Sequence, residues 1–186
     1  MPPKARITKD EVIKTAIELI RAGGAEALNA RAIAAALCCS TQPIFSNFEN
    51  MDALSDAVIC ATYDLYLGFI KREVENGKYP RYKAFGMAYI RFAKEEKELF
   101  KLLFMRDRGD SESTQSADFN ASVKIIMEQN GVSQEKAERM HMETWIFVHG
   151  IATMLATSFL GLSENMISEM LTDAYQGLRA RHVTEE

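Results

Sequence analysis

Hydrophobic residues recur along most of the chain at every third or fourth position, which is the spacing of one face of an α-helix. The sequence holds no sustained alternation of apolar and polar residues. It also holds no Asn-Gly or Asp-Gly turn flanked by such alternation, which would be typical of a β-hairpin. The pattern therefore predicts an all-α fold.

The first predicted helix has clear signals at both ends. Thr8 and Glu11 have the spacing of a capping box, in which each side chain bonds a free backbone N–H near the beginning of the helix. A Gly-Gly pair at 23–24 follows the apolar face and favours a helix end. We expect a helix from about residue 9 to 22.

Two short helices follow this first one. Asn29 is a favoured N-cap for a helix over residues 30–37, whose alanine-rich interior lets another helix approach closely. Ser40 is a favoured N-cap for the next helix, and Pro43 then falls in its first turn, where no helical hydrogen bond is lost. Two short helices joined by a tight turn are typical of a helix-turn-helix unit.

Six further helices are predicted from the same period together with Ser, Pro, Asn and Gly boundary signals. A charged and polar loop is expected between the third and the fourth of them, at residues 107–115. The six helices cover residues 51–76, 80–94, 97–106, 116–129, 133–160 and 163–181.

Net charge and cysteine content limit the classes of protein to which the chain can belong. The 186 residues carry a net charge of −4, which argues against a protein that coats nucleic acid but allows a local basic face. Three cysteines, two of them adjacent, do not form a disulfide framework. With no apolar segment of the signal-peptide type at the beginning, the sequence indicates a reduced, cytoplasmic protein.

The second helix of a helix-turn-helix unit enters the DNA major groove by its N-terminal residues. Here these are Thr41, Gln42 and Pro43, which are short or neutral. A glutamine can bond adenine through two hydrogen bonds, and a proline ring or a threonine methyl group can contact a thymine methyl group. The alternative is a helical hairpin with a purely structural role.

Phosphate contacts are expected from basic residues outside this helix, which has no Arg or Lys. Lys4, Arg6 and Lys9 crowd the first nine residues, which contain no acid. Arg31 lies at the beginning of the preceding helix.

Residues 28–54 resemble the DNA-binding signature of the TetR (tetracycline repressor) family. Ser40 matches its turn serine, and Ile44 and Phe48 match its apolar anchors. The resemblance implies an N-terminal three-helix helix-turn-helix domain, residues 1–50, followed by a six-helix ligand-binding and dimerisation domain, residues 51–186.

The sequence also departs from that signature. The family usually has Gly at Cys38, Thr at Pro43, Tyr at Phe45, His at Asn47 and Lys at Met51, and the last three commonly contact phosphates. Asn47 retains an amide that can donate to a phosphate. The expected DNA-binding residues are Lys4, Arg6, Arg31, Ser40, Thr41, Gln42, Pro43, Phe45, Ser46 and Asn47.

Two later segments resemble one class of TetR C-terminal domains. Residues 97–104 are similar to a segment of that class, and residues 145–150 are similar to its Trp…His-Gly signature. The resemblance implies a ligand cavity between the later helices, although each aromatic residue taken alone also suits a plain core. The expected ligand-binding residues are Phe69, Phe85, Tyr89, Phe104, Trp145 and His149.

Metal and catalytic chemistry find little support. Glu138 and His141 have the Glu-x-x-His spacing of di-iron bundles, but such sites need two of these motifs and the chain has one. His141 and His149 would lie about 12 Å apart along one helix, too far to share an ion. No nucleophile elbow, phosphate loop or Cys-x-x-Cys pair is present. We expect no metal, no cofactor and no enzyme activity.

Residues 144–163 contain no Asp, Glu, Lys or Arg and meet the length of a membrane span. Acidic flanks, two glycines and a histidine favour instead a helix covered by neighbours or by a second subunit.

Together these features predict a cytoplasmic, ligand-responsive repressor of the TetR type. It would be a homodimer joined through the helices at 133–160 and 163–181, bind a palindromic double-stranded operator and be released by a small apolar ligand. Two alternatives remain: a helical enzyme or carrier with this topology, and a membrane-associated interaction protein.

Overall fold

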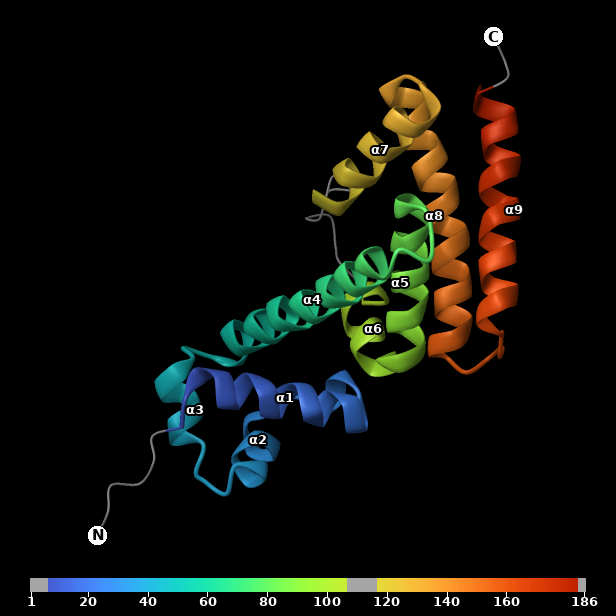
Figure 1. The fold of residues 1–186 in the computed structure, drawn as a ribbon. Helices are drawn as coiled ribbons and strands as arrows, with labels where there is room; N and C mark the ends of the chain where they lie inside the picture. The colour runs from blue at the N-terminus through green and yellow to red at the C-terminus, as the bar shows by residue number, and fades with distance from the viewer. Residues whose placement is uncertain (1–6, 107–116, 184–186) are drawn as a thin grey trace. The chain divides into compact units, whose positions relative to one another are not determined.

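The computed structural model describes residues 7–106 and 117–183, and all regular structure in these two segments is helical, as the sequence predicts (Figure 1). The expected loop at 107–115 lies outside the described residues. The helices are α1 (Lys9–Gly23), a short 3-10 helix (Ala25–Ala27), α2 (Ala30–Ala36), α3 (Gln42–Asn47), α4 (Met51–Asn76), α5 (Arg81–Glu95), α6 (Lys97–Phe104), α7 (Ala117–Asn130), α8 (Gln134–Ala156) and α9 (Glu164–Val183).

The predicted caps of α1 and α2 are confirmed. The Thr8 amide donates to Glu11 Oε2 over 2.8 Å, and the Glu11 amide donates back to Thr8 Oγ1 over 3.2 Å. At α2 the Ala32 amide donates to Asn29 Oδ1 over 2.9 Å. Each cap gives a first-turn N–H an acceptor that the helix itself cannot supply.

The beginning of α3 differs from the prediction. Its N-cap is Thr41 and not Ser40, and no side chain caps it. The Thr41 carbonyl accepts from the amides of Ile44 and Phe45, over 3.1 and 3.3 Å, so the first turn is built on that peptide. Pro43 does fall in the first turn, as predicted, where its missing N–H has no helical acceptor to lose.

Helix α2 ends in a Schellman motif without glycine. The Cys39 amide donates to the Ala34 carbonyl over 2.9 Å, and the Cys38 amide to the Ala35 carbonyl over 3.1 Å. Cys38 holds the left-handed position of the motif at φ 51°, where glycine is the usual residue. Its side chain is exposed.

We expect Cys38→Gly to raise the free energy of unfolding by about 0.5–1 kcal/mol. A non-glycine residue in the left-handed region costs roughly 1–2 kcal/mol, and the greater chain entropy of glycine offsets part of the gain. Denaturant unfolding measures the change. Cys39→Gly is the matched control, since Cys39 has no positive φ, and it should destabilise the protein. A lower stability for Cys38→Gly would contradict the assignment of strain.

The end of α8 corrects a second prediction. The sequence predicts a helix that continues to about residue 160 and ends at Gly161, but the helix ends at Ala156. Ser158 adopts φ 57°, and the amides of Ser158 and Phe159 bond the carbonyls of Leu155 and Met154 in a second Schellman motif. The turn therefore forms without a glycine and gives no signal in the sequence.

The described chain divides into two compact units, and each is built from separate stretches of sequence. The first contains residues 1–67 and 96–106, and the second contains residues 68–95 and 107–186. Helix α4 thus begins in the first unit and ends in the second. The predicted boundary after residue 50 separates the expected DNA-binding domain from the expected ligand-binding and dimerisation domain. This division by function stays a prediction.

In the first unit α1 contacts α2, α3 and α6. Fully buried side chains from all of these helices and from α4 fill its interior. Arg21 also binds Glu96 through two hydrogen bonds, from Nε over 2.8 Å and from a terminal nitrogen over 2.7 Å. The fully buried apolar residues are Val12, Ala16, Ile20, Ile33, Ile44, Leu54, Val58, Leu99 and Phe100.

In the second unit α8 contacts α5, α7 and α9, and α5 also contacts α9. Gly86 on α5 permits this last approach, because a Cβ atom there would lie 3.0 Å from a methyl group of Leu171 on α9. One core cluster joins α5, α7 and α8, and it consists of Tyr82, Val123, Ile125, Ile126, Ala137 and Met140.

Candidate functional site

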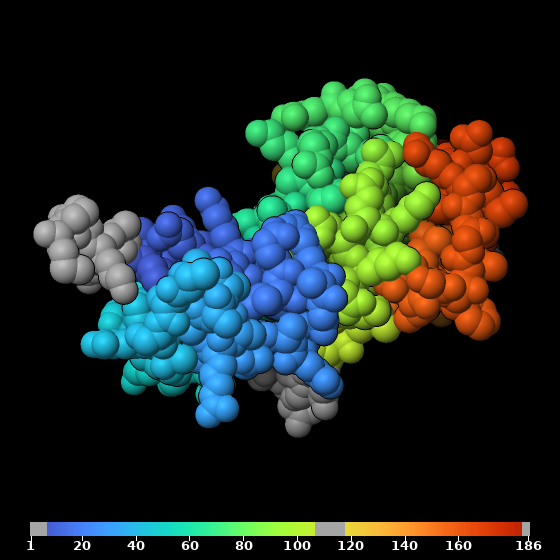
Figure 2. All heavy atoms as spheres, turned by 90° about the horizontal axis from the view of Figure 1, so that it is seen from below, coloured from blue at the N-terminus to red at the C-terminus, as the bar shows by residue number. Residues whose placement is uncertain are grey.

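Helix α3 presents a neutral exposed face above a buried anchor. Gln42, Phe45 and Ser46 are exposed and lie at positions i, i+3 and i+4, so they share one side of the helix. Ile44 is fully buried and Phe48 is 4% exposed, so both hold the helix against the first unit. Figure 2 shows α1, α2 and α3, coloured blue to cyan, at the surface.

The other expected DNA-binding residues differ in their exposure. Arg31 and Ser40 are exposed, and Thr41 and Pro43 are half-buried. Lys4 and Arg6 lie outside the described residues. The expected base-reading residues therefore lie on α3 and in the turn before it, and Arg31 is exposed on α2.

Two polar side chains of α3 have partners within the protein. Ser46 Oγ donates to the Gln42 carbonyl over 2.9 Å. The Asn47 amide donates both to the Ile7 carbonyl over 3.1 Å and to the Pro43 carbonyl over 2.8 Å. Since a primary amide has two N–H groups, both are used in the observed geometry.

Three of the expected ligand-binding residues meet in the second unit, between α5 and α8. The Tyr89 hydroxyl lies 2.8 Å from His149 Nδ1. The Trp145 ring stacks on the His149 ring with centroids 5.1 Å apart and planes 18° apart. Tyr89 is buried, whereas Trp145 is 42% exposed, so the cluster extends from the core to the surface.

The remaining three expected ligand-binding residues have other neighbours. Phe69 lies edge-on to Phe92, and Phe85 packs against the core cluster of the second unit. Phe104 belongs to the first unit, where its ring contacts those of Tyr66 and Phe100.

A second tyrosine–histidine pair, which the sequence did not predict, lies in the second unit. The Tyr82 hydroxyl lies 2.9 Å from His141 Nδ1, and the Phe119 ring packs edge-on against His141. Burial lowers the pKa of His141 to about 4, so this imidazole is neutral at pH 7. Tyr82 and Tyr89 are seven residues apart and the two histidines eight, which is a spacing that facing helices could have suggested.

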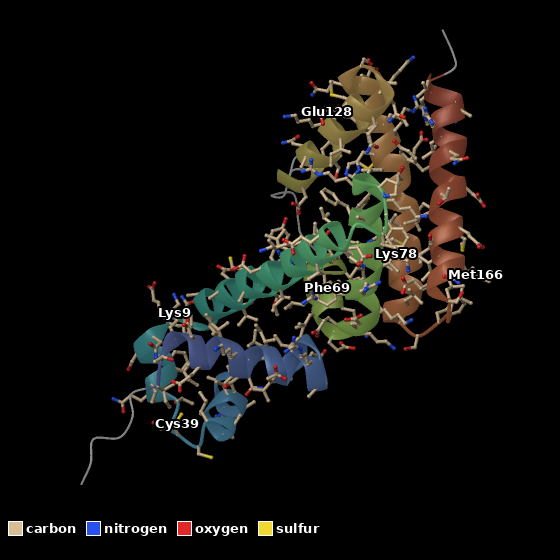
Figure 3. All side chains as sticks on the ribbon, in the orientation of Figure 1. Lys9, Cys39, Phe69, Lys78, Glu128 and Met166 are labelled. Atoms are coloured by element: carbon tan, nitrogen blue, oxygen red, sulfur yellow. The ribbon has the colours of Figure 1, made fainter. Side chains whose placement is uncertain are left out.

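A charged cluster joins α4, α5 and α9 in the second unit. Glu73 is 3% exposed, and its Oε2 lies 3.4 Å from a guanidinium nitrogen of Arg91. The second terminal nitrogen of Arg91 lies 3.4 Å from Glu164 Oε1. The same oxygen accepts a hydrogen bond from Lys78 over 2.7 Å. The hydrogen bond from Lys78 is the largest cause of the lowered pKa of Glu164. Figure 3 labels Lys78.

Two other features bear on alternative functions. A groove of about 320 Å³ lies in the first unit between α1 and α4, with Ile13, Ile17 and Leu65 among its lining residues. It is separate from the expected ligand-binding residues. Among residues 7–106 and 117–183, no group of three or more His, Cys, Asp or Glu side chains could hold a metal ion.

The apolar run at 144–163 does not form one helix, because α8 ends at Ala156. Its thirteen helical residues, 144–156, rise about 20 Å, which is short of a bilayer core of roughly 30 Å. In the described part of the chain one helix, α4, is long and apolar enough to span a membrane. That criterion uses length and composition alone, and buried core helices meet it as well.

Comparisons with known proteins agree with this architecture. The family model described as the tetracyclin repressor-like C-terminal domain matches residues 82–176, just over half of the chain. No curated protein matches the sequence.

Two solved structures are similar to the chain. One, from Rhodococcus sp. RHA1, is described as a protein with unknown function. It is 21% identical, with a TM-score of 0.76, and the match covers 99% of this chain and 100% of that one. The other is a putative TetR family transcriptional regulator from Vibrio parahaemolyticus, 14% identical with a TM-score of 0.62, over 91% and 97% of the two chains. The matched C-terminal domain, together with the all-helical fold, places this chain in the TetR family of transcriptional regulators.

Proposed function

We propose that the chain is a cytoplasmic, ligand-responsive repressor that binds a palindromic DNA operator as a homodimer. The observation that carries the proposal is α3, a short helix with an exposed uncharged face on buried anchors in a member of the TetR family. This arrangement suits a helix that reads bases in the major groove.

Base recognition is assigned to the beginning of α3. Gln42 is exposed and can bond adenine through its amide, and Thr41 and Pro43 supply carbon groups for a thymine methyl group. Phosphate attraction is assigned to Arg31, Lys4 and Arg6, since α3 itself has no basic residue.

Dimerisation is assigned to the apolar surface of α8 and α9. Ile146 is 59% exposed, and Trp145, Met154 and Met166 (labelled in Figure 3) are also exposed. Large apolar side chains that remain exposed on these two helices favour burial against a partner. Two copies would place their α3 helices in major grooves about one DNA turn apart, roughly 34–36 Å, or a multiple of it.

Ligand response is assigned to the Tyr89–His149–Trp145 cluster. It combines aromatic surface with two polar groups, which is the usual make-up of a site for a small, mostly apolar ligand. Such a ligand would favour a form of the dimer whose spacing no longer fits the operator. Trp145 is the one tryptophan of the chain, so its fluorescence would report binding.

Fluorescence anisotropy with DNA from upstream of the protein's own gene tests the proposal. We expect tight, salt-dependent binding to a palindrome and weaker binding to a single half-site. Thr41→Ala/Gln42→Ala should weaken palindrome binding at least about tenfold, because removal of a good base-reading side chain costs roughly 1–3 kcal/mol.

A control separates base reading from general charge. Lys124→Ala removes a charge from an exposed residue of α7, outside the expected DNA-binding set, and should leave affinity unchanged. Equal binding of wild type to the palindrome and to random DNA at every salt concentration would refute operator recognition. The enzyme or carrier alternative would then become the better description.

A further inference from the structure

The side chain of Asn47 connects the recognition helix to the residue at which the basic N-terminal segment ends. Its Nδ2 donates to the carbonyl of Ile7, forty positions earlier in the chain, and to that of Pro43 on α3. Both partners are carbonyl oxygens, which only accept, so the amide nitrogen must face them and the amide oxygen faces away. The two distances, 3.1 and 2.8 Å, are those of ordinary hydrogen bonds.

Two further contacts, made by residues at the beginning of α1, hold the chain next to Ile7. The capping box between Thr8 and Glu11 holds the residue after Ile7 at the beginning of α1. The Lys9 ammonium lies 5.1 Å from the centroid of the Phe48 ring, directly after α3 (Lys9 is labelled in Figure 3). Residues 7–9 are therefore held to the end of the recognition helix at two points.

This placement bears on the charges that precede Ile7. Arg6 is its neighbour, and Lys4 lies three residues before it, a span of at most about 10–11 Å of extended chain. A short tether to a fixed point raises the effective concentration of both charges at phosphates near that point.

We infer that Asn47 is a positioning residue, which holds the base of the N-terminal segment against α3 and strengthens DNA binding through Lys4 and Arg6. This inference rests on the proposed DNA-binding function. A direct phosphate contact does not fit the observed geometry. Both amide hydrogens are in use, and the remaining oxygen is an acceptor that a phosphate, itself an acceptor, cannot bond.

A double-mutant cycle separates the two roles. The variants are Asn47→Ala, Lys4→Ala/Arg6→Ala and their combination, all in the full-length protein and assayed by anisotropy on the palindrome across a salt series. Asn47→Ala should weaken binding about three- to tenfold in the wild-type background but less than about twofold where the two basic residues are absent. Equal losses in both backgrounds would overturn the inference.

The salt dependence gives a second readout that a merely structural role would not change. Each phosphate that a basic residue no longer neutralises reduces the slope of log K against log salt by about 0.9, so the removal of Lys4 and Arg6 from both subunits reduces it by up to about 3.6. Asn47→Ala should reproduce part of that reduction although asparagine is uncharged. An unchanged slope with weakened binding would indicate a direct neutral contact and contradict the positioning role.

A measurement without DNA keeps this test independent of the proposed function. Proteolysis is faster where residues beside the cleaved bond leave the fold locally. Asn47→Ala, which frees Ile7, should therefore raise the rate of trypsin cleavage after Arg6 by at least about threefold. Asn47→Leu, which is similar in size and lacks the donor, should behave alike if the alanine variant folds poorly. An unchanged cleavage rate refutes the attachment itself. Faster cleavage in a protein that binds no operator leaves the attachment standing and refutes only the DNA-binding function.

Discussion

Replacement of Arg91 by methionine is expected to lower the free energy of unfolding by about 2–4 kcal/mol. Arg91 is the cation next to Glu73, whose side chain is 3% exposed, and no other cation is seen to pair with Glu73 within residues 7–106 and 117–183. A buried charge that loses its partner typically costs 3–5 kcal/mol. We expect less than the full value because Arg91 itself is about one-third exposed, so water already screens the pair.

The geometry around Glu73 strengthens this expectation. Its Oε1 is buried and has no hydrogen-bond partner. Arg91 is therefore the main group that replaces the hydration which the carboxylate loses on folding. Consequently Glu73→Met in the Arg91→Met background should recover most of the lost stability, since the double variant no longer buries an unpaired charge.

A matched control is available on α4. Lys71 and Glu75 form an exposed pair at 3.9 Å, and Lys71→Met should change the stability by less than about 0.5 kcal/mol. Denaturant unfolding at one fixed protein concentration measures all four proteins, because association also adds to apparent stability. Equal effects of Arg91→Met and Lys71→Met would show that burial of Glu73 does not govern the cost.

Acidification provides the second large expected effect. His141 takes up a proton near pH 4 in the folded protein, because burial lowers its pKa to about 4, but near pH 6.5 in the unfolded chain. Between these values the unfolded state binds more protons, so stability is complete above about pH 6.5 and falls as the pH is lowered towards 4. The difference between the two pKa values corresponds to roughly 3–4 kcal/mol of stability.

Comparison with His141→Gln isolates this contribution. Glutamine stays neutral at every pH and can still accept a hydrogen bond from Tyr82. Hydrogen bonds also lower the pKa of Glu11 and Glu164. The stability that these two carboxylates contribute to the fold is therefore also lost as the pH falls. The informative quantity is therefore the difference between the two pH profiles. Parallel profiles between pH 4 and 6.5 would show that His141 gains its proton as easily folded as unfolded.

The helices could be predicted because their signals are local. The capping box of α1 and the period of its apolar face are contained in a few neighbouring residues, and they gave its beginning correctly. The ends of α2 and α8 show the limit of such signals. Cys38 and Ser158 adopt the left-handed conformation without the glycine that usually marks it. For α8, which has no other stop signal until Gly161, the predicted end came too late.

The contacts that matter most for the candidate sites join residues far apart in sequence. The bond of Asn47 to Ile7 and the pair Tyr82–His141 span forty and fifty-nine positions. No spacing rule within one helix identifies such partners, because they depend on how helices pack. The sequence alone predicted that α3 bears the neutral DNA-reading residues, but it gave no indication that Asn47 would be engaged by the protein itself.

The composition of the first unit has a practical consequence for gene fusion and domain exchange. The chain passes between the two units three times, at 67–68, 95–96 and 106–107. A fragment that stops after residue 50, or even after α4, lacks α6 and the Glu96 partner of Arg21, so it exposes the side of α1 that α6 covers. A chimera that transplants the helix-turn-helix unit onto another member of the family must carry residues 96–106 as a second insert. A single crossover in α4 would join two incomplete cores.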